Sequence, residues 1–480
     1  MKRGDQCSGY EPIYVWVKGY QKYPPGRRRV LRSDLTWHGY TIHQSPEIDA
    51  FITQCDVESH DETEAVEKAA GPFTVFCTPV GYPRVPPSIS DTPNSTRSDV
   101  RIIKELCHHY FTYTALNMMP FKDKRNPWMS FYPRLARQGS SRGQRALYNA
   151  MLAQAAGNLA QLGSQRDKMS ALAIKFYADG IKDLRKGLES KEMDFSTVVA
   201  SIMTLIMAEI YAGISNVWRM HLDGAWNFLV THKHEKPWEA SEEAWTIAQS
   251  LIIVKIRVDT MGVPSLNSTQ LNEAISPFIA AVVCRHEFGF TAGADGILMN
   301  HLHDVNMLES RLRHGDGKVQ QYREDVAGLY QRIQSYGLEA SSSNQLVRLH
   351  HEIFRTGVLV HFHRRILNSL PHTLVPLLDN LLSSVEEYER LKGGYVTLWP
   401  VFIGAAEVFE EHQKLRVRAW LDTVDLMGAA NRRDVRTVIE AVWNERSCQR
   451  NLLGRRVAEG EVIVDWREVM RDMGVEILLV

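Results

Sequence analysis

The sequence predicts an all-α fold, in which a large multi-helix domain over residues 97–480 follows a basic tail (1–35) and a disordered, acidic and proline-rich linker (36–96). Three observations lead to this prediction. From about residue 98 onward, apolar residues recur with the period of amphipathic helices. Alternating stretches long enough for a sheet are almost absent, the weak exceptions being residues 462–464 and 477–480. Before residue 98, charge runs and prolines replace any regular pattern.

The tail is strongly basic, although the charge of the whole chain is balanced. Its 35 residues contain eight Lys and Arg against three Asp and Glu, a net charge of +5, whereas the whole chain has 56 residues of each sign. A solvated tail fits this composition, and so does a segment that contacts nucleic-acid phosphates or a nuclear import receptor. For the second interpretation, the candidate contacts are Lys2, Arg3, Arg27, Arg28 and Arg29.

The linker is predicted from composition alone. Six acidic residues lie within residues 56–67, and six prolines lie within residues 72–93. Such a segment buries too little apolar surface to offset the entropy of ordering it, so we expect disorder.

Cysteine usage and hydropathy indicate an intracellular protein that does not span a membrane. The six cysteines are scattered and form no CxxC pair, which is unlike a disulfide scaffold. The amino terminus has no apolar core of the kind found in secretory signals. The most apolar run, residues 198–213, is short for a membrane span and contains Glu209.

The helical domain is organised around residues 194–232, which predict a buried helical hairpin. In the first helix we expect a stripe of small side chains, which another helix can approach closely, opposite a bulky face. The stripe comprises Thr197, Ser201, Thr204, Ala208 and Ala212, and the bulky face comprises Val199, Ile202, Met203, Ile206 and Ile210. We expect Gly213 to end this helix and Ser215 or Asn216 to cap the next.

The remaining helices are expected on both sides of this hairpin. Their ranges are 99–119, 142–162, 168–188, 241–261, 269–284, 296–313, 318–336, 344–370, 373–390, two helices within 399–427, 432–446, and a short piece at 465–473. Five tryptophans are expected to be core anchors, namely Trp218, Trp226, Trp399, Trp420 and Trp443.

No motif nominates a catalytic centre. The sequence has no glycine-rich phosphate loop, no GxSxG and no HExxH. Histidine pairs occur on predicted helices, and His303-Asp304 is the best metal candidate among them, although a dipeptide is a weak signal. The sequence therefore predicts no enzyme and no cofactor.

Residues 2–16, KRGDQCSGYEPIYVW, resemble the end of the fungal six-cysteine binuclear zinc cluster and the residues that follow it. The resemblance implies that Cys7 is the sixth zinc ligand and that Trp16 is the aromatic residue found after the cluster. The other five thiolates are missing, and one thiolate does not hold two zinc ions. Zinc is therefore implied only if the rest of the cluster is encoded upstream.

A second resemblance covers nearly the whole helical region. From residue 99 to the end, the chain resembles the fungal-specific transcription factor domain that accompanies such clusters. The matching passages follow the order of the family: HHYFTYTALNMMPF (108–121), NPWMSFYPRLA (126–136), ALYNAMLAQAAGNLAQL (146–162), WRMHLDGAWNFL (218–229), HEIFRTGVLVHFHRRIL (351–367), LWPVFIGAAEVFEEHQ (398–413) and VDWREVMRDMGVEILL (464–479).

Four residues of the passage at 218–229 carry physical expectations. Gly224 matches the family pattern and predicts a close helix crossing, and His221 is expected to cap or bond a neighbouring helix. Arg219 and Asp223 are four residues apart and can pair across one helical turn.

The resemblance implies a nuclear regulator of gene expression, often of a metabolic pathway or a natural-product gene cluster. It implies a regulatory, effector-responsive helical domain without enzymatic activity. One hypothesis is a zinc-cluster regulator whose start lies upstream of Met1, with promoter DNA and a dimer partner as its partners. The alternative is a regulator without a cluster that acts through an intact partner or a bound metabolite. An all-α metabolic enzyme is the third hypothesis.

Overall fold

The computed structural model describes residues 97–137, 141–190, 194–214, 217–262, 268–314, 319–337, 344–391, 393–454 and 456–480. These residues fall within one compact unit, Val85–Val480. The predicted basic tail and linker lie outside the described residues and stay predictions.

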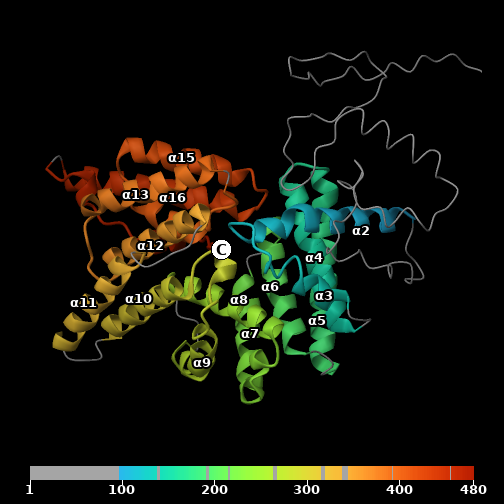
Figure 1. The fold of residues 1–480 in the computed structure, drawn as a ribbon. Coiled ribbons are helices and arrows are strands. Elements are labelled where there is room, and N and C mark those ends of the chain that lie inside the picture. The colour runs from blue at the N-terminus through green and yellow to red at the C-terminus, as the bar shows by residue number, and fades with distance from the viewer. Residues whose placement is uncertain are drawn as a thin grey trace, which may run out of the picture. The chain divides into compact units, whose positions relative to one another are not determined.

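Every regular element in these ranges is a helix, which confirms the all-α prediction (Figure 1). The α-helices are α2 (Arg97–His109), α3 (Phe131–Arg137), α4 (Arg142–Gln161), α5 (Arg166–Ser190), α6 (Phe195–Ala212), α7 (Trp218–His232), α8 (Glu242–Asp259), α9 (Ser268–Val283), α10 (Gly296–His314), α11 (Val319–Ser335), α12 (Gln345–Arg365), α13 (Val375–Arg390), α14 (Leu398–Glu407), α15 (Glu411–Asp425), α16 (Asn431–Leu453) and α17 (Trp466–Asp472). Short 3-10 or π turns are η3 (Tyr110–Thr114), η4 (Leu116–Met118), η5 (Lys233–Glu235), η6 (Pro237–Glu239), η7 (Phe290–Ala292), η8 (Pro371–Leu374) and η9 (Glu459–Glu461).

The helices form two groups that meet along the middle of this unit. In the first group α4 packs against α5 and α6, and α6 also contacts α7 and α8. In the second group α12 packs against α13 and α14, and α14 contacts α16. The groups are joined where α8 contacts α10, and the carboxyl end of the chain lies between them in Figure 1.

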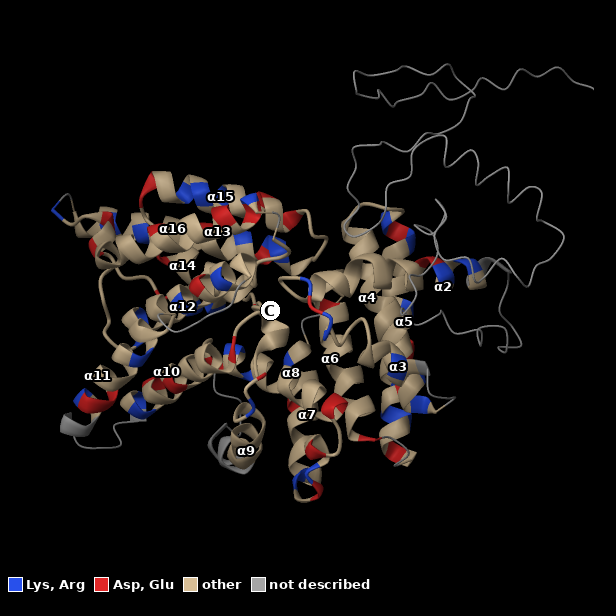
Figure 2. Ribbon diagram, viewed as in Figure 1, with Lys and Arg blue, Asp and Glu red and all other residues tan. Residues whose placement is uncertain are grey.

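Helix α6 is the central packing element, as its sequence predicts. It begins after Asp194, whose carboxylate accepts hydrogen bonds from the backbone N–H of Thr197 at 3.0 Å and from the Thr197 hydroxyl at 2.6 Å. It ends at Gly213, which adopts a left-handed φ of 64° as expected. Both its small-residue stripe and its bulky face are buried almost throughout. Figure 2 shows few charged residues along α4 and α6, whereas α11 and α15 carry both signs.

The small stripe of α6 is approached by α4, and Gly157 is the residue that permits this. A Cβ placed on Gly157 would lie 2.6 Å from the Cβ of Ala212 and 2.9 Å from its Cα. Such distances are well inside van der Waals contact, so only glycine allows the two helices to approach this closely.

Helix α6 is also the one helix of the described residues that is long and apolar enough to cross a membrane. However, 83% of its apolar window is buried inside the protein. Its hydropathy is therefore explained by packing against α4, α5 and α8.

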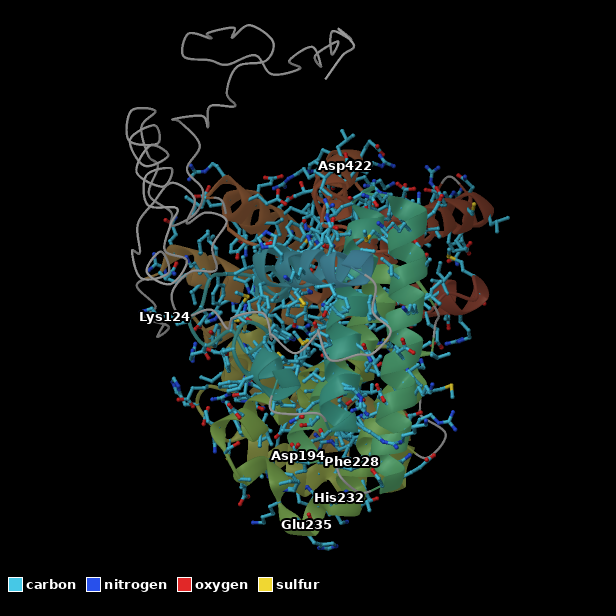
Figure 3. The ribbon with its side chains drawn as sticks, turned by 90° about the vertical axis from the view of Figure 1, so that its right-hand side faces the viewer. Lys124, Asp194, Phe228, His232, Glu235 and Asp422 are labelled. Atoms are coloured by element: carbon cyan, nitrogen blue, oxygen red, sulfur yellow. The ribbon has the colours of Figure 1, made fainter. Side chains whose placement is uncertain are left out.

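Side chains at the two ends of the unit come from different helices (Figure 3). Asp194, Phe228, His232 and Glu235 lie toward one end, where α6 begins and α7 finishes, and Asp422 of α15 lies toward the other. At the first end the Phe228 ring stacks on Phe195, with ring centroids 6.3 Å apart.

Several sequence expectations about elements need correction. Residues 462–464 and 477–480 are extended and mostly buried but do not pair as strands. Helix α3 has no counterpart among the predicted helices. Helix α16 continues to Leu453, because no helix-breaking residue occurs before Gly454, whose φ is 90°. The N-cap of α7 is Val217, and the predicted caps Ser215 and Asn216 lie outside the described residues.

Other expectations are confirmed. Residues 399–427 form two helices, α14 and α15. All five tryptophans expected in the core are at most 3% exposed, namely Trp218, Trp226, Trp399, Trp420 and Trp443.

Candidate functional site

The site residues predicted from the sequence all lie in the tail. Cys7, Lys2, Arg3, Arg27, Arg28 and Arg29 are outside the described residues, so their roles as zinc ligand and phosphate contacts stay predictions. The structure instead draws attention to the helical domain.

His221 bonds neighbouring helices, as expected. Its Nε2 lies 2.7 Å from the Tyr177 hydroxyl of α5 and 3.1 Å from a carboxylate oxygen of Glu209 on α6. Tyr177 also donates a hydrogen bond to Glu209. Because Glu209 is only 3% exposed, this cluster satisfies one oxygen of a buried carboxylate and ties α5, α6 and α7 together.

Two other expectations for this passage are wrong. A Cβ on Gly224 would meet no atom within 4 Å, so Gly224 faces open space and makes no close helix crossing. Arg219 pairs with Glu476 at 2.6 Å and stacks on Trp218 rather than pairing with Asp223. In both cases the passage lies at the edge of the core, where the partners come from the end of the chain.

The histidines do not form a metal site in the described residues. No group of three or more His, Cys, Asp or Glu side chains there could hold a metal ion. Asp304, the best candidate from sequence, pairs with Arg332 at 3.2 Å. His350 is fully buried between the carbonyl oxygen of Gly293 and the backbone N–H of Thr397. Burial lowers the pKa of His350 to about 3, so this imidazole is neutral at physiological pH.

A cavity opens where the two helix groups and the end of the chain meet. Its empty volume is about 750 Å³, including the space at its mouth. Helices α6 and α8 provide much of its wall, and the segments before and after α13–α16 close it. The lining residues are Asn117, Met118, Trp128, Tyr132, Met203, Met207, Tyr211, Ser250, Ile253, Val254, Arg257, Thr291, Ala292, Tyr395, Met427, Ala429, Arg432 and Val480.

The part of the wall before α16 is held in place by α4 and α6. The Asn158 side chain of α4 donates hydrogen bonds to the carbonyl oxygens of Met427 at 2.9 Å and Gly428 at 2.8 Å. The backbone N–H of Ala430 donates to the carbonyl oxygen of Tyr211 at 3.2 Å. These bonds fix the turn that brings Arg432 to the cavity.

Two buried arginines line this cavity, Arg257 of α8 and Arg432 of α16, each 5% exposed. Among the described residues the guanidinium of Arg257 has no hydrogen-bond or ion-pair partner. Arg432 donates to the Tyr395 hydroxyl and, at 3.2 Å, to the main-chain oxygen of Val480, while its Nε and Nη1 are unpartnered. Burial lowers the pKa of Arg257 to about 10.

The other deeply buried arginines are all paired with an acid. Of the five arginines at most 9% exposed, Arg364 and Arg446 bond Glu407 at 2.9 and 3.3 Å, and Arg467 bonds Glu309 at 3.0 Å. Only the two that line the cavity lack a carboxylate partner within the described ranges. An unpaired buried charge is costly, so this arrangement is unusual for a purely structural role.

Sequence analysis missed both arginines, although a weak signal existed. Neither Arg257 nor Arg432 has an Asp or Glu three or four residues away on its helix, whereas Lys255 pairs with Asp259 at 2.7 Å in this way. The absence of a local partner is common for surface arginines, and only burial makes it informative.

The fold and the cavity therefore define an all-α domain with a ligand-sized, positively charged interior site. Residues 105–480 match the family described as the fungal specific transcription factor domain, and the chain belongs to that family. No curated protein and no solved structure matches the chain.

Proposed function

We propose that the protein is a nuclear transcription regulator of a fungal metabolic or natural-product gene cluster. The helical domain is its regulatory part, and the basic tail contacts promoter DNA. The observation that supports this best is the family match over residues 105–480, which spans nearly all of the helical domain. Family membership also suggests a regulator rather than an enzyme.

The cysteines of the tail do not by themselves fit a binuclear zinc cluster. Such a cluster needs six thiolates, and only Cys7 lies in the tail. We therefore derive no zinc-dependent step from this sequence. Zinc and autonomous DNA binding belong to the proposal only if upstream sequence supplies the other cysteines.

The alternative is a regulator without a cluster, which acts through an intact dimer partner or a bound metabolite. Mapping the 5′ end of the transcript separates the two forms. A longer reading frame with two CxxC pairs supports the zinc form, and an in-frame stop codon with no splice acceptor supports the form without a cluster.

Chromatin immunoprecipitation of a tagged chain, with transcript profiling of a deletion strain, tests the proposal common to both forms. We expect nuclear signal, enrichment at a set of promoters, and altered transcripts of the adjoining genes. A chain excluded from the nucleus, with no promoter enrichment and an unchanged transcript profile, would refute the regulator.

The basic tail can be tested separately. Changing Arg27, Arg28 and Arg29 to Ala removes three positive charges, which should weaken promoter binding and flatten its dependence on salt. The matched control removes three exposed charges of α5, Lys182, Arg185 and Lys186, and should leave both properties unchanged. Equal effects of the two triple variants would contradict a specific role for the tail.

A further inference from the structure

We propose that the cavity between the two helix groups binds a small, apolar organic acid, whose carboxylate pairs with Arg257 while its hydrocarbon part lies against the cavity wall. In the regulator proposed above this molecule is the effector, and that assignment rests on the proposed function. Binding itself does not depend on DNA recognition, and the test below measures binding alone.

The anion contact is Arg257. Its side chain is 5% exposed, lines the cavity, and has no hydrogen-bond or ion-pair partner in the described parts of the chain. A guanidinium presents several N–H donors in one plane, and a carboxylate can accept two of them in parallel. A bound carboxylate would therefore supply the partner that every other deeply buried arginine of this domain already has.

Arg432 strengthens the positive field but is less available. It already donates to the Tyr395 hydroxyl and to Val480, and its guanidinium lies 5.0 Å from the centre of the Tyr395 ring. Its Nε and Nη1 remain unpartnered. We therefore place the direct contact at Arg257 and assign Arg432 a supporting electrostatic role.

No side chain of the cavity wall neutralises these two charges. The lining residues contain no Asp or Glu. Burial raises the pKa of Tyr211 and of Tyr395, so both phenols are neutral at physiological pH. The nearby His350 uses both ring nitrogens in hydrogen bonds and is also neutral. The site thus favours an anion over a neutral molecule of the same shape.

The rest of the wall selects an apolar molecule. Four methionines line it, Met118, Met203, Met207 and Met427, together with Trp128 and aliphatic residues of α8. Methionine side chains adapt to ligands of different shapes, and aromatic rings pack against flat apolar groups. A free phosphate or a sugar acid would leave this surface without a partner. The empty volume of about 750 Å³ lies within the range of small-molecule sites.

The test uses the purified full chain and pairs of probes that differ only in charge. Phenylacetate, benzoate and octanoate are compared with their primary amides and with inorganic phosphate, by thermal shift and calorimetric titration. We expect at least one carboxylate to raise the melting temperature and to bind about tenfold or more tightly than its amide, because a charge-assisted contact is lost in the amide. Inorganic phosphate should give no shift.

Three variants locate the contact. Arg257→Met should reduce carboxylate binding about tenfold or more, to the level of the amide. Val254→Phe keeps Arg257 but fills the cavity, and should also abolish binding. The matched control Arg433→Met removes an exposed charge beside Arg432 and should leave binding unchanged.

Circular dichroism of each variant shows whether it folds. Three results would overturn the proposal: no probe of the series binds in preference to its amide, Arg257→Met binds carboxylates as tightly as the unmodified protein, or Val254→Phe folds and still binds. Because none of these measurements involves DNA, failure here leaves the proposed regulator function standing. Loss of promoter enrichment, conversely, leaves the binding site standing.

Discussion

Replacing Arg257 by Met should make the ligand-free protein more stable. Arg257 is buried in α8 and its guanidinium has no partner among the described residues. Met fills a similar volume without a charge. The variant therefore removes an uncompensated buried charge while keeping most of the packing around the side chain.

The size of the effect follows from the shifted pKa. Burial lowers the pKa of Arg257 from 12.5 to about 10. The charged form is therefore disfavoured in the folded state, and one pKa unit corresponds to about 1.4 kcal/mol, so the charge costs the folded state about 3 kcal/mol. This cost is fully present below pH 10 and is relieved only as the pH rises from about 10 toward 12.5. We expect a gain of about 1–3 kcal/mol in the free energy of unfolding, since imperfect packing of Met offsets part of it.

Urea denaturation followed by far-ultraviolet circular dichroism measures this gain. The midpoint should move to higher urea, by the same amount at two pH values in the neutral to mildly alkaline range, because both lie below the pKa of Arg257. The paired Arg446 is the contrasting control. It donates hydrogen bonds to Glu407 and to three carbonyl oxygens, so Arg446→Met should lower stability by about 3–5 kcal/mol.

A loss of stability in Arg257→Met as large as that in Arg446→Met would refute the reasoning. It would mean that the Arg257 guanidinium makes favourable contacts in the absence of ligand. A midpoint gain present at neutral pH but absent at mildly alkaline pH would contradict the assigned pKa.

Three further predictions concern packing and electrostatics. Gly157→Ala should lower the free energy of unfolding by about 1–3 kcal/mol because its Cβ meets Ala212, whereas Gly224→Ala should raise it by up to about 1 kcal/mol in the same urea assay. Burial alone would raise the pKa of Glu309, but the guanidinium of Arg467 and other charges outweigh it and lower the pKa to about 2. Glu309 therefore stabilises the fold above its unfolded pKa of about 4.5 by about 3 kcal/mol, a contribution lost as the pH falls toward 2, and Glu309→Gln should flatten acid unfolding in that range. Asp194→Ala removes the N-cap of α6 and should cost about 1 kcal/mol by thermal shift, and an unchanged melting temperature would contradict the capping role.

Local patterns were enough to predict the elements that depend on near neighbours in the chain. The apolar run of α6 ends at Gly213 because a left-handed residue closes a helix, and this can be read from the sequence. The break between α14 and α15 was also predicted correctly. Residues 462–464 were misread as a weak strand, because a short buried apolar run does not reveal whether a pairing partner exists.

The residues around the hairpin show where such reading stops. His221 was expected to bond a neighbouring helix, but its partners Tyr177 and Glu209 come from two other helices. Gly224 was expected at a close crossing, whereas Gly157, which the sequence did not single out, provides it. A helical glycine looks the same from sequence whether its face meets another helix or solvent.

The sequence by itself determined the helical class, the central place of α6 and, through the resemblance of its helical region, the family. These depend on periodicity, helix-ending residues and ordered passages, all of which are local. Only the tertiary structure decided that Arg257 and Arg432 are buried in one cavity without an acid. They are 175 positions apart in the sequence, and an arginine becomes an anion site only when folding removes water from it and supplies no carboxylate in return.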